Sequence, residues 1–189
     1  KDLIDALNNN NILTRYNAGM KIRQHGSAAV LPLVSTVKNG NDNAREAALI
    51  LLNDLDIPEH ALPKIRAMAE DSLTSRKNPK ISAGLISVLT NAHDMQSVPL
   101  FEKAVKSQHK ALLAAGLRGI RKLEGTQLLP LLLRKYPESK HLIQREIENT
   151  ILSLCENSEQ KLKQHFDKIP PKQRFTLVKI LKASSTHNA

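Results

Sequence analysis

Histidine and cysteine are the residues of this sequence that could ligate a metal ion or supply a nucleophile. The seven histidines are spread along the chain, at positions 25, 60, 93, 109, 141, 165 and 187. None of them forms an HExxH motif or a close pair with the spacing that metal ligands need. We therefore expect surface histidines, no metal site and no cofactor.

Cys155 is the only cysteine, and it lies in the apolar stretch ILSLCEN. Apolar surroundings disfavour the thiolate, so we expect a buried structural thiol and not a nucleophile. The sequence also lacks the GxSxG, P-loop and GxGxxG motifs of hydrolases and nucleotide-binding proteins. It therefore predicts a protein without enzymatic activity.

Basic residues offer a different chemistry, the binding of anions, and the net charge is +10. Residues 1–100 hold 11 Lys and Arg against 10 Asp and Glu, whereas residues 101–189 hold 17 against 8. This asymmetry indicates an acidic partner (nucleic acid, an anionic membrane surface or an acidic protein face) or else a solubilising surface. Arg118, Arg121 and Lys122 form the clearest cluster, because residues three and four positions apart share one helix face.

The composition indicates which elements position these residues. Hydrophobic residues make up 41% and aromatic residues only 3%, so the core must consist of Leu, Ile, Val and Ala, which favours helices over strands. No run approaches the ~18 apolar residues of a transmembrane segment. A single cysteine allows no internal disulfide and favours a reducing compartment such as the cytoplasm. Because the chain begins at Lys1 and not Met, we expect it to be a fragment or a processed product of a longer protein.

Prolines recur along the sequence together with a second marker. Pro32, Pro63, Pro99 and Pro130 are separated by 31, 36 and 31 residues. A pair of small residues and a large apolar residue begins 14 to 16 positions before each proline, in Ala18-Gly19-Met20, Ala47-Ala48-Leu49, Ala83-Gly84-Leu85 and Ala115-Gly116-Leu117. The small pair and the proline keep a nearly constant spacing over four units, which indicates an internal repeat.

Each unit is predicted to be a pair of helices, with the proline in the first turn of the second helix. Backbone N–H groups lack intrahelical partners there, so a proline costs little. Ser27 and Thr126 are the expected N-caps of two such helices. Pro32 and Pro130 then lie five and four residues past the cap, which leaves a bend in the helix open as an alternative. The small pairs are expected to let neighbouring helices pack closely.

These units resemble HEAT and HEAT-like repeats, with an Ala-rich helix, a tight turn and a helix of AVLPL-like spacing. Arg45, two residues before Ala47, matches an Arg that the family often carries. The resemblance covers about residues 11–138 and continues weakly over 139–184, where Arg145 and Thr176 replace the small residue. It implies an all-α fold, a right-handed α-solenoid of about five to six helix pairs that forms a single array over residues 1–189, with one concave face.

The family includes scaffolds, transport receptors, enzyme subunits and DNA-repair enzymes, so the resemblance leaves the function open. The His-Glu pairs of deoxyhypusine hydroxylase are absent, and so is an acid flanked by aromatics as in alkylpurine DNA glycosylases. The preferred hypothesis is a protein-binding or scaffold module, part of a larger protein or complex, that takes an acidic or amphipathic segment. The alternative is nucleic-acid backbone binding by the basic C-terminal half.

In such arrays the Ala-marked helices line the concave face. With the first Ala counted as zero, the solvent positions fall near +3 and +6. An apolar centre with Ile50, Ile86 and Leu89 would then lie beside a basic end, although Ile50 and Ile86 could instead pack against neighbouring helices. The predicted partner-binding residues are Lys21, Ile50, Asn53, Ile86, Arg118, Arg121, Lys122, Lys179 and Lys182.

Overall fold

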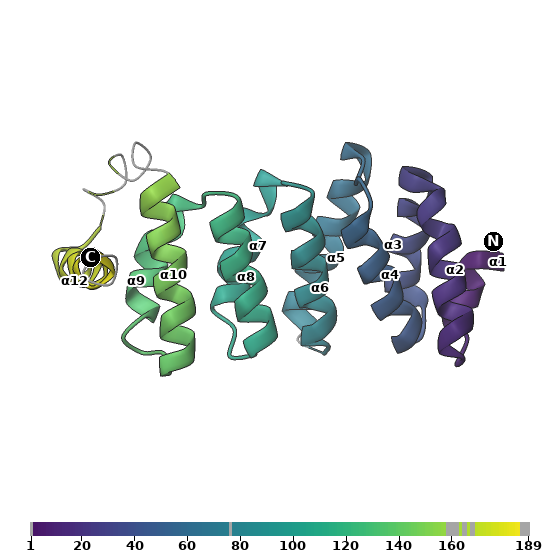
Figure 1. The fold of residues 1–189 in the computed structure, drawn as a ribbon, viewed down its shortest axis with the longest axis horizontal. Coiled ribbons are helices and arrows are strands. Elements are labelled where there is room, and N and C mark those ends of the chain that lie inside the picture. Colours follow the sequence, from purple (N-terminus) through teal and green to yellow (C-terminus); the bar gives the residue numbers. More distant parts are fainter. Residues whose placement is uncertain (1, 76, 158–162, 164–165, 167–168, 186–189) are drawn as a thin grey trace.

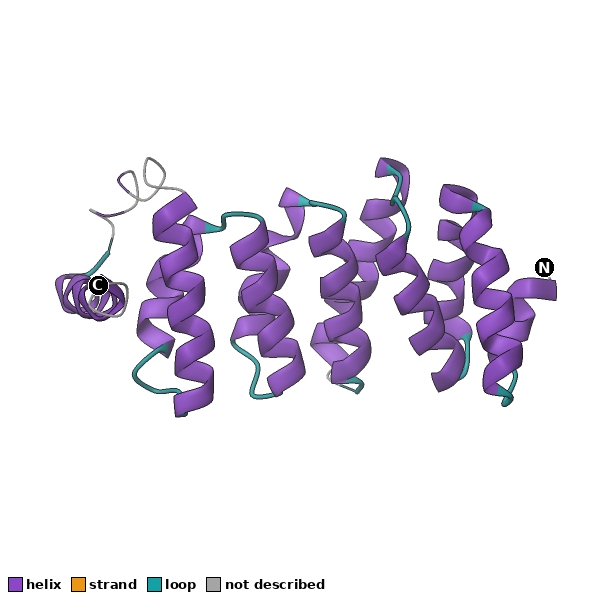
Figure 2. Cartoon of the chain, viewed as in Figure 1, coloured by secondary structure: helices purple, strands orange, loops and turns teal. Residues whose placement is uncertain are grey.

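The computed structural model describes residues 2–75, 77–157, 163, 166 and 169–185 of the chain. Helices and short connections account for these residues, and none of them belongs to a strand (Figure 2). The all-α fold predicted from the composition is therefore confirmed. Within the described ranges, no helix is long and apolar enough to cross a membrane.

Most of the elements are α-helices of 7 to 17 residues, and several of them follow a short 3-10 turn. The α-helices are α1 (Asp2–Asp5), α2 (Ile12–Gln24), α3 (Val30–Asn39), α4 (Asp42–Asp54), α5 (Leu62–Ser75), α6 (Pro79–Asn91), α7 (Val98–Val105), α8 (Lys110–Lys122), α9 (Leu129–Lys135), α10 (His141–Asn157) and α12 (Pro171–Ser185). The 3-10 turns are η1 (Ala6–Asn8), η2 (Gly26–Ala29), η3 (Glu59–Ala61), η4 (Met95–Ser97) and η5 (Thr126–Leu128).

The helices stand side by side in a row with two layers (Figure 1). In the front layer α4 contacts α2 and α6, and α8 contacts α6 and α10. In the rear layer α5 contacts α3 and α7. Leu and Ile side chains between the layers are fully buried, with Leu33, Ile65 and Phe101 among the largest. The core therefore runs along the row between the two layers.

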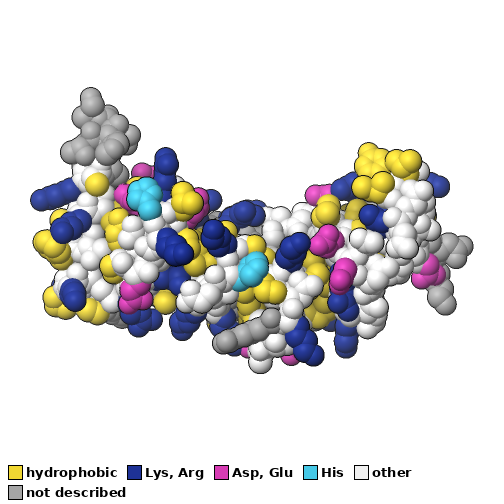
Figure 3. Space-filling view, turned by 90° about the horizontal axis from the view of Figure 1, so that it is seen from below, with side chains coloured by type: hydrophobic (Ala, Val, Ile, Leu, Met, Phe, Trp, Pro, Cys, Tyr) yellow, Lys and Arg dark blue, Asp and Glu magenta, His cyan; other side chains and the backbone are white. Residues whose placement is uncertain are grey.

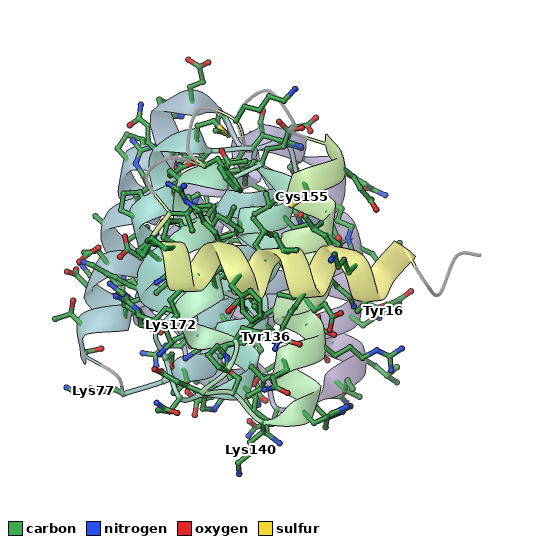
Figure 4. All side chains as sticks on the ribbon, turned by 90° about the vertical axis from the view of Figure 1, so that its left-hand side faces the viewer. Tyr16, Lys77, Tyr136, Lys140, Cys155 and Lys172 are labelled. Atoms are coloured by element: carbon green, nitrogen blue, oxygen red, sulfur yellow. The ribbon has the colours of Figure 1, made fainter. Side chains whose placement is uncertain are left out.

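Helix α12 departs from this arrangement. It packs on α9 and α10 through Leu177 and Ile180, which are both buried. Figure 4 shows it lying crosswise over the end of the row, while the helices behind it run vertically. Its C-terminal end points toward the side on which Tyr16 of α2 lies, which is the side of the front layer.

The recurring prolines lie where the spacing predicts. Pro32 is the third residue of α3, and Pro63, Pro99 and Pro130 are the second residues of α5, α7 and α9. The residues before them form the 3-10 turns η2 to η5, so each α-helix begins only one or two residues before its proline. The missing N–H thus falls among groups that have no intrahelical partner.

The predicted N-caps were wrong. Ser27 lies inside η2 and Thr126 is the first residue of η5. The N-termini of α3 and α9, which follow these turns, have no side-chain cap. Asparagine caps three of the front-layer helices, because Asn11, Asn41 and Asn78 accept hydrogen bonds from the first turns of α2, α4 and α6. A short asparagine side chain is among the best acceptors for these N–H groups.

The small residues mark close helix contacts, as predicted. A Cβ added to Gly84 would lie 2.6 Å from Cδ1 of Leu49 on α4. At Gly116 it would lie 2.9 Å from the Cβ of Ala104 and 3.0 Å from the carbonyl oxygen of Phe101, both on α7. At Gly116 the obstructing atoms include the backbone of α7, so a larger residue would push the two helices apart, whereas at Gly84 the end of the Leu49 side chain would have to move.

Two glycine substitutions test this packing. Gly116→Ala should destabilise the fold by ~1–3 kcal/mol, because backbone atoms of α7 cannot yield to the new methyl group. Gly19→Ala is the matched control, since its Cβ would meet only the Leu51 side chain, at ordinary distances of 3.6 and 3.9 Å. It should leave stability unchanged or raise it by up to ~1 kcal/mol through helix propensity. Urea denaturation measures both, and equal effects of the two variants would contradict this packing.

Candidate functional site

Helix α8 places the predicted basic cluster on the surface. Leu117 and Ile120 are buried in the stack, and Arg118, Arg121 and Lys122 are exposed on the opposite face. The helical period of 3.6 residues produces this division, since 118, 121 and 122 lie one turn apart on one side. The structure therefore brings these three residues together, as predicted.

Arg118 and Arg121 are available to bind an anion. Among the described residues, no carboxylate pairs with either guanidinium. The arginines of α2 are engaged, because Arg15 donates to the carbonyl oxygens of Asn9 and Asn10, and Nε of Arg23 donates to Asp54 at 3.0 Å. Unpaired guanidiniums at the surface lose no existing bond when a carboxylate or phosphate binds.

A chain of polar contacts connects the C-terminal ends of three front helices. Nζ of Lys122 donates to Oδ1 of Asn91 on α6 at 3.1 Å, and Nδ2 of Asn91 donates to Oδ1 of Asn53 on α4 at 2.9 Å. Asn53 is half-buried and also donates to the carbonyl oxygen of Leu49. Asn53 and Lys122, both predicted as contact residues, therefore already hold these helices together.

The prediction for Ile86 was wrong. Ile86 and Leu89 of α6 are fully buried, so neither can line an exposed apolar strip. Ile50 of α4, in contrast, has 59% of its surface exposed. The predicted apolar centre over α4 and α6 is therefore reduced to its α4 side.

The error came from the register of α6. Aligning the marker Ala47 of α4 with the marker Ala83 of α6 gives an offset of 36 residues between the two helices. Aligning their buried residues gives an offset of 37. With that offset Ser87 takes the position of Ile50, and Ala83, Gly84 and Ser87 are only partly exposed. The pairs of buried residues that define the offset are Ala44 and Ile81, Ala48 and Leu85, and Leu52 and Leu89. Hence α6 exposes small side chains where α4 and α8 expose large ones.

Exposed apolar side chains gather at the N-terminal end of the front layer. Ile12 and Tyr16 of α2 are 70% and 61% exposed, and with Ile50 they line a pocket of about 200 Å³. Gly19 and Ala47 also line this pocket. The small pair of α2 does not predict this pocket. The apolar residues of the stretch ILTRY that lie outside the core positions of α2 do indicate exposed apolar surface.

The front layer forms a hollowed surface. Figure 3 shows the molecule of Figure 1 from below. The front layer, which faces the viewer in Figure 1, therefore forms the upper edge of the molecule in Figure 3, and this edge is indented in the middle. Hydrophobic side chains stand at the raised end that carries the N-terminal helices. The indentation agrees with the small exposed side chains of α6.

The remaining predicted cations lie elsewhere. Lys21 is exposed on α2, and Lys179 and Lys182 are exposed on α12. Lys179 stacks over the ring of Phe175, with its Nζ 4.8 Å from the ring centroid. The structure thus places α12 and its cations at the C-terminal end of the row, on a different helix from the α8 cluster.

The described residues contain no group of three or more His, Cys, Asp and Glu side chains that could hold a metal ion. His165 and His187 lie outside the described residues. The pKa of the Cys155 thiol is raised to about 11, mainly by desolvation and to a smaller extent by the negative charge of Glu156. This thiol is therefore protonated at neutral pH, as expected for a structural residue.

No protein-family model matches this chain, and a search of curated proteins finds no significant match. The assignment of a function therefore depends on the surface described above.

The raised pKa of Cys155 predicts the pH dependence of its alkylation. Only the thiolate reacts, so the rate with iodoacetamide should rise about tenfold per pH unit from pH 7 and show no plateau below about pH 10. Mass spectrometry of the chain measures this rate. Cys155 is only partly buried, and a plateau near pH 8.5, the pKa of a free thiol, would contradict the desolvation of its sulfur.

Proposed function

We propose that this chain is a HEAT-like right-handed α-solenoid that acts as a non-enzymatic protein-binding module. Its hollowed front face takes an acidic or amphipathic segment of a partner protein. The two-layer row of helix pairs and the recurring prolines support the solenoid, because stacked repeats that contact mainly their neighbours form such arrays. The segment binds where the front face offers both charge and apolar surface.

The unpaired arginines of α8 carry this proposal. Arg118 and Arg121 are exposed on the front layer without carboxylate partners among the described residues. A partner carboxylate gains a charge-assisted hydrogen bond there, and the positive C-terminal half steers its approach. The apolar pocket on α2 and α4 adds a place to bury a side chain, which supplies affinity that surface charges lack.

Charge reversal tests the role of the arginines. A random 12-residue peptide library is selected on the immobilised wild-type chain, on Arg118→Glu/Arg121→Glu, and on Lys38→Glu/Lys64→Glu. Lys38 and Lys64 are exposed on the rear layer, so the control has the same change in net charge. Acidic peptides should be enriched on the wild type and the control but not on the arginine variant.

Stability should change by no more than ~0.5 kcal/mol for each surface substitution in both double variants. Equal enrichment of acidic peptides on the arginine variant and the control would contradict the proposal. So would the absence of acidic peptides from the wild-type selection.

Nucleic-acid backbone binding is the second candidate, because unpaired arginines also suit phosphates. Each phosphate contact contributes about −0.9 to the slope of log K against log salt concentration. If Arg118, Arg121 and the two predicted contact lysines of α12 are the residues that contact phosphates, the slope for duplex DNA is no steeper than about −3.6. A titration that gave a slope steeper than about −5 would contradict the protein-binding proposal and favour nucleic acid.

A further inference from the structure

We infer that the front face binds an extended peptide with two determinants at a fixed distance: one large apolar side chain, and a pair of carboxylates five or six residues away. This inference rests on the proposed function and specifies its partner. The apolar side chain enters the pocket on α2 and α4, and the carboxylates contact Arg118 and Arg121 on α8. The peptide backbone crosses the small side chains of α6 between them.

The pocket fits one side chain. Its volume is about 200 Å³, and its wall is formed by Ile12, Tyr16 and Ile50. A cavity of about 150 Å³ lined by apolar side chains can hold a benzene molecule, so this pocket suits a side chain such as Leu or Phe. The two arginines that also line it, Arg15 and Arg23, are engaged in the hydrogen bonds described above. Arg23 is therefore paired with a carboxylate, whereas Arg15 is held by neutral carbonyl oxygens and keeps its positive charge at the edge of the pocket.

The two determinants occupy equivalent positions of the repeat. Buried residues of α4 recur in α8 at an offset of 68, in the pairs Ala44 and Leu112, Ala48 and Gly116, and Leu52 and Ile120. With this offset Ile50 corresponds to Arg118. Since both helices belong to the front layer and both contact α6, these side chains emerge on the same face.

The distance between the determinants follows from helix packing. Neighbouring helix axes lie about 8–10 Å apart, so the α4 wall of the pocket, where Ile50 lies, is about 16–20 Å from α8 across α6. An extended chain advances about 3.3 Å per residue, which gives about five to six residues. A helical peptide would need about 11–13 residues for the same span.

The floor between the determinants favours the extended form. Ala83, Gly84 and Ser87 of α6 are only partly exposed and rise little above their backbone. They make the indentation in the front face, which admits a peptide backbone more readily than a full helix with side chains. Asn91 lies at the edge of this floor and is already bonded to Asn53 and Lys122.

Charge fixes which end of the peptide lies over which helix. Glu46 is exposed on α4, one turn from Ile50, and no cation pairs with it among the described residues. A peptide carboxylate beside the apolar anchor would lie near this like charge as well as Arg15, whereas one at α8 faces two unpaired arginines and no carboxylate that pairs with them among the described residues. The acidic pair therefore has to lie away from the anchor, which distinguishes this partner from any merely acidic segment.

A peptide series tests the spacing. Fluorescein-labelled peptides carry one Leu, a spacer of Ser and Thr, and an Asp-Asp pair, with the acids 1, 3, 5, 6, 8 or 12 residues from the Leu, in both chain directions. Fluorescence polarisation measures their Kd for the chain. Affinity should be highest at five or six residues and about tenfold lower at one residue. A flat series, or a maximum at 12 residues, would overturn the inference.

Variants assign each determinant. Ile50→Ala should raise the Kd of the best peptide about five- to tenfold. It should not change the Kd of the same peptide with its Leu replaced by Ala, because Ile50 contributes to binding only through contact with that Leu. Ile50 is a surface residue, so the variant keeps the fold. Ala111, exposed on α8, provides the control Ala111→Ser, which should change nothing.

The outcomes separate this inference from the proposed function. If acidic peptides bind through Arg118 and Arg121 but Ile50→Ala and the spacer length have no effect, the inference is wrong and the protein-binding function stands. If none of the designed peptides binds, the inference is also wrong. The proposed function falls with it only if the random library yields no acidic peptide either.

Discussion

The close packing of neighbouring helices at the glycines of α6 and α8 is the constraint on which the remaining structure depends. The side chain of Leu49 on α4 lies so near to Gly84 of α6 that a methyl group there would collide with it, and Gly116 of α8 approaches the backbone of α7. These contacts fix how closely α6 packs on α4 and how closely α8 packs on α7. They also fix which residues of each helix face solvent, and so which side chains can reach a partner.

The hollowed face follows from that constraint. Because α6 is held with Ala83, Gly84 and Ser87 outward, the middle of the front layer lies low, whereas α2 and α4 present Tyr16 and Ile50 and α8 presents Arg118. Apolar surface and positive charge are thus set apart on one rigid layer. The polar contacts of Asn91 with its neighbours on α4 and α8 keep these helices in register.

Periodicity in the sequence predicts much of this arrangement. The prolines mark the first turns of the rear helices, and Arg118, Arg121 and Lys122 share an exposed face because their spacing requires it. Ile86 could not be placed correctly, because the Ala-Gly-Leu marker of α6 is shifted by one residue and one residue turns a helix by 100°. The caps were missed because 3-10 turns shift the helix starts past Ser27 and Thr126. The pocket at Tyr16 depends on contacts between α2 and α4 that no single helix pattern contains.

If the front layer of α2, α4, α6 and α8 binds the partner, amide chemical shifts of the ¹⁵N-labelled chain will locate the contact as an acidic peptide selected on this chain is added. We expect shifts at Tyr16, Ile50, Ser87 and Arg118, with α3, α5 and α7 unchanged. Shifts centred on the rear layer, or spread evenly over both layers, would contradict binding by the front layer.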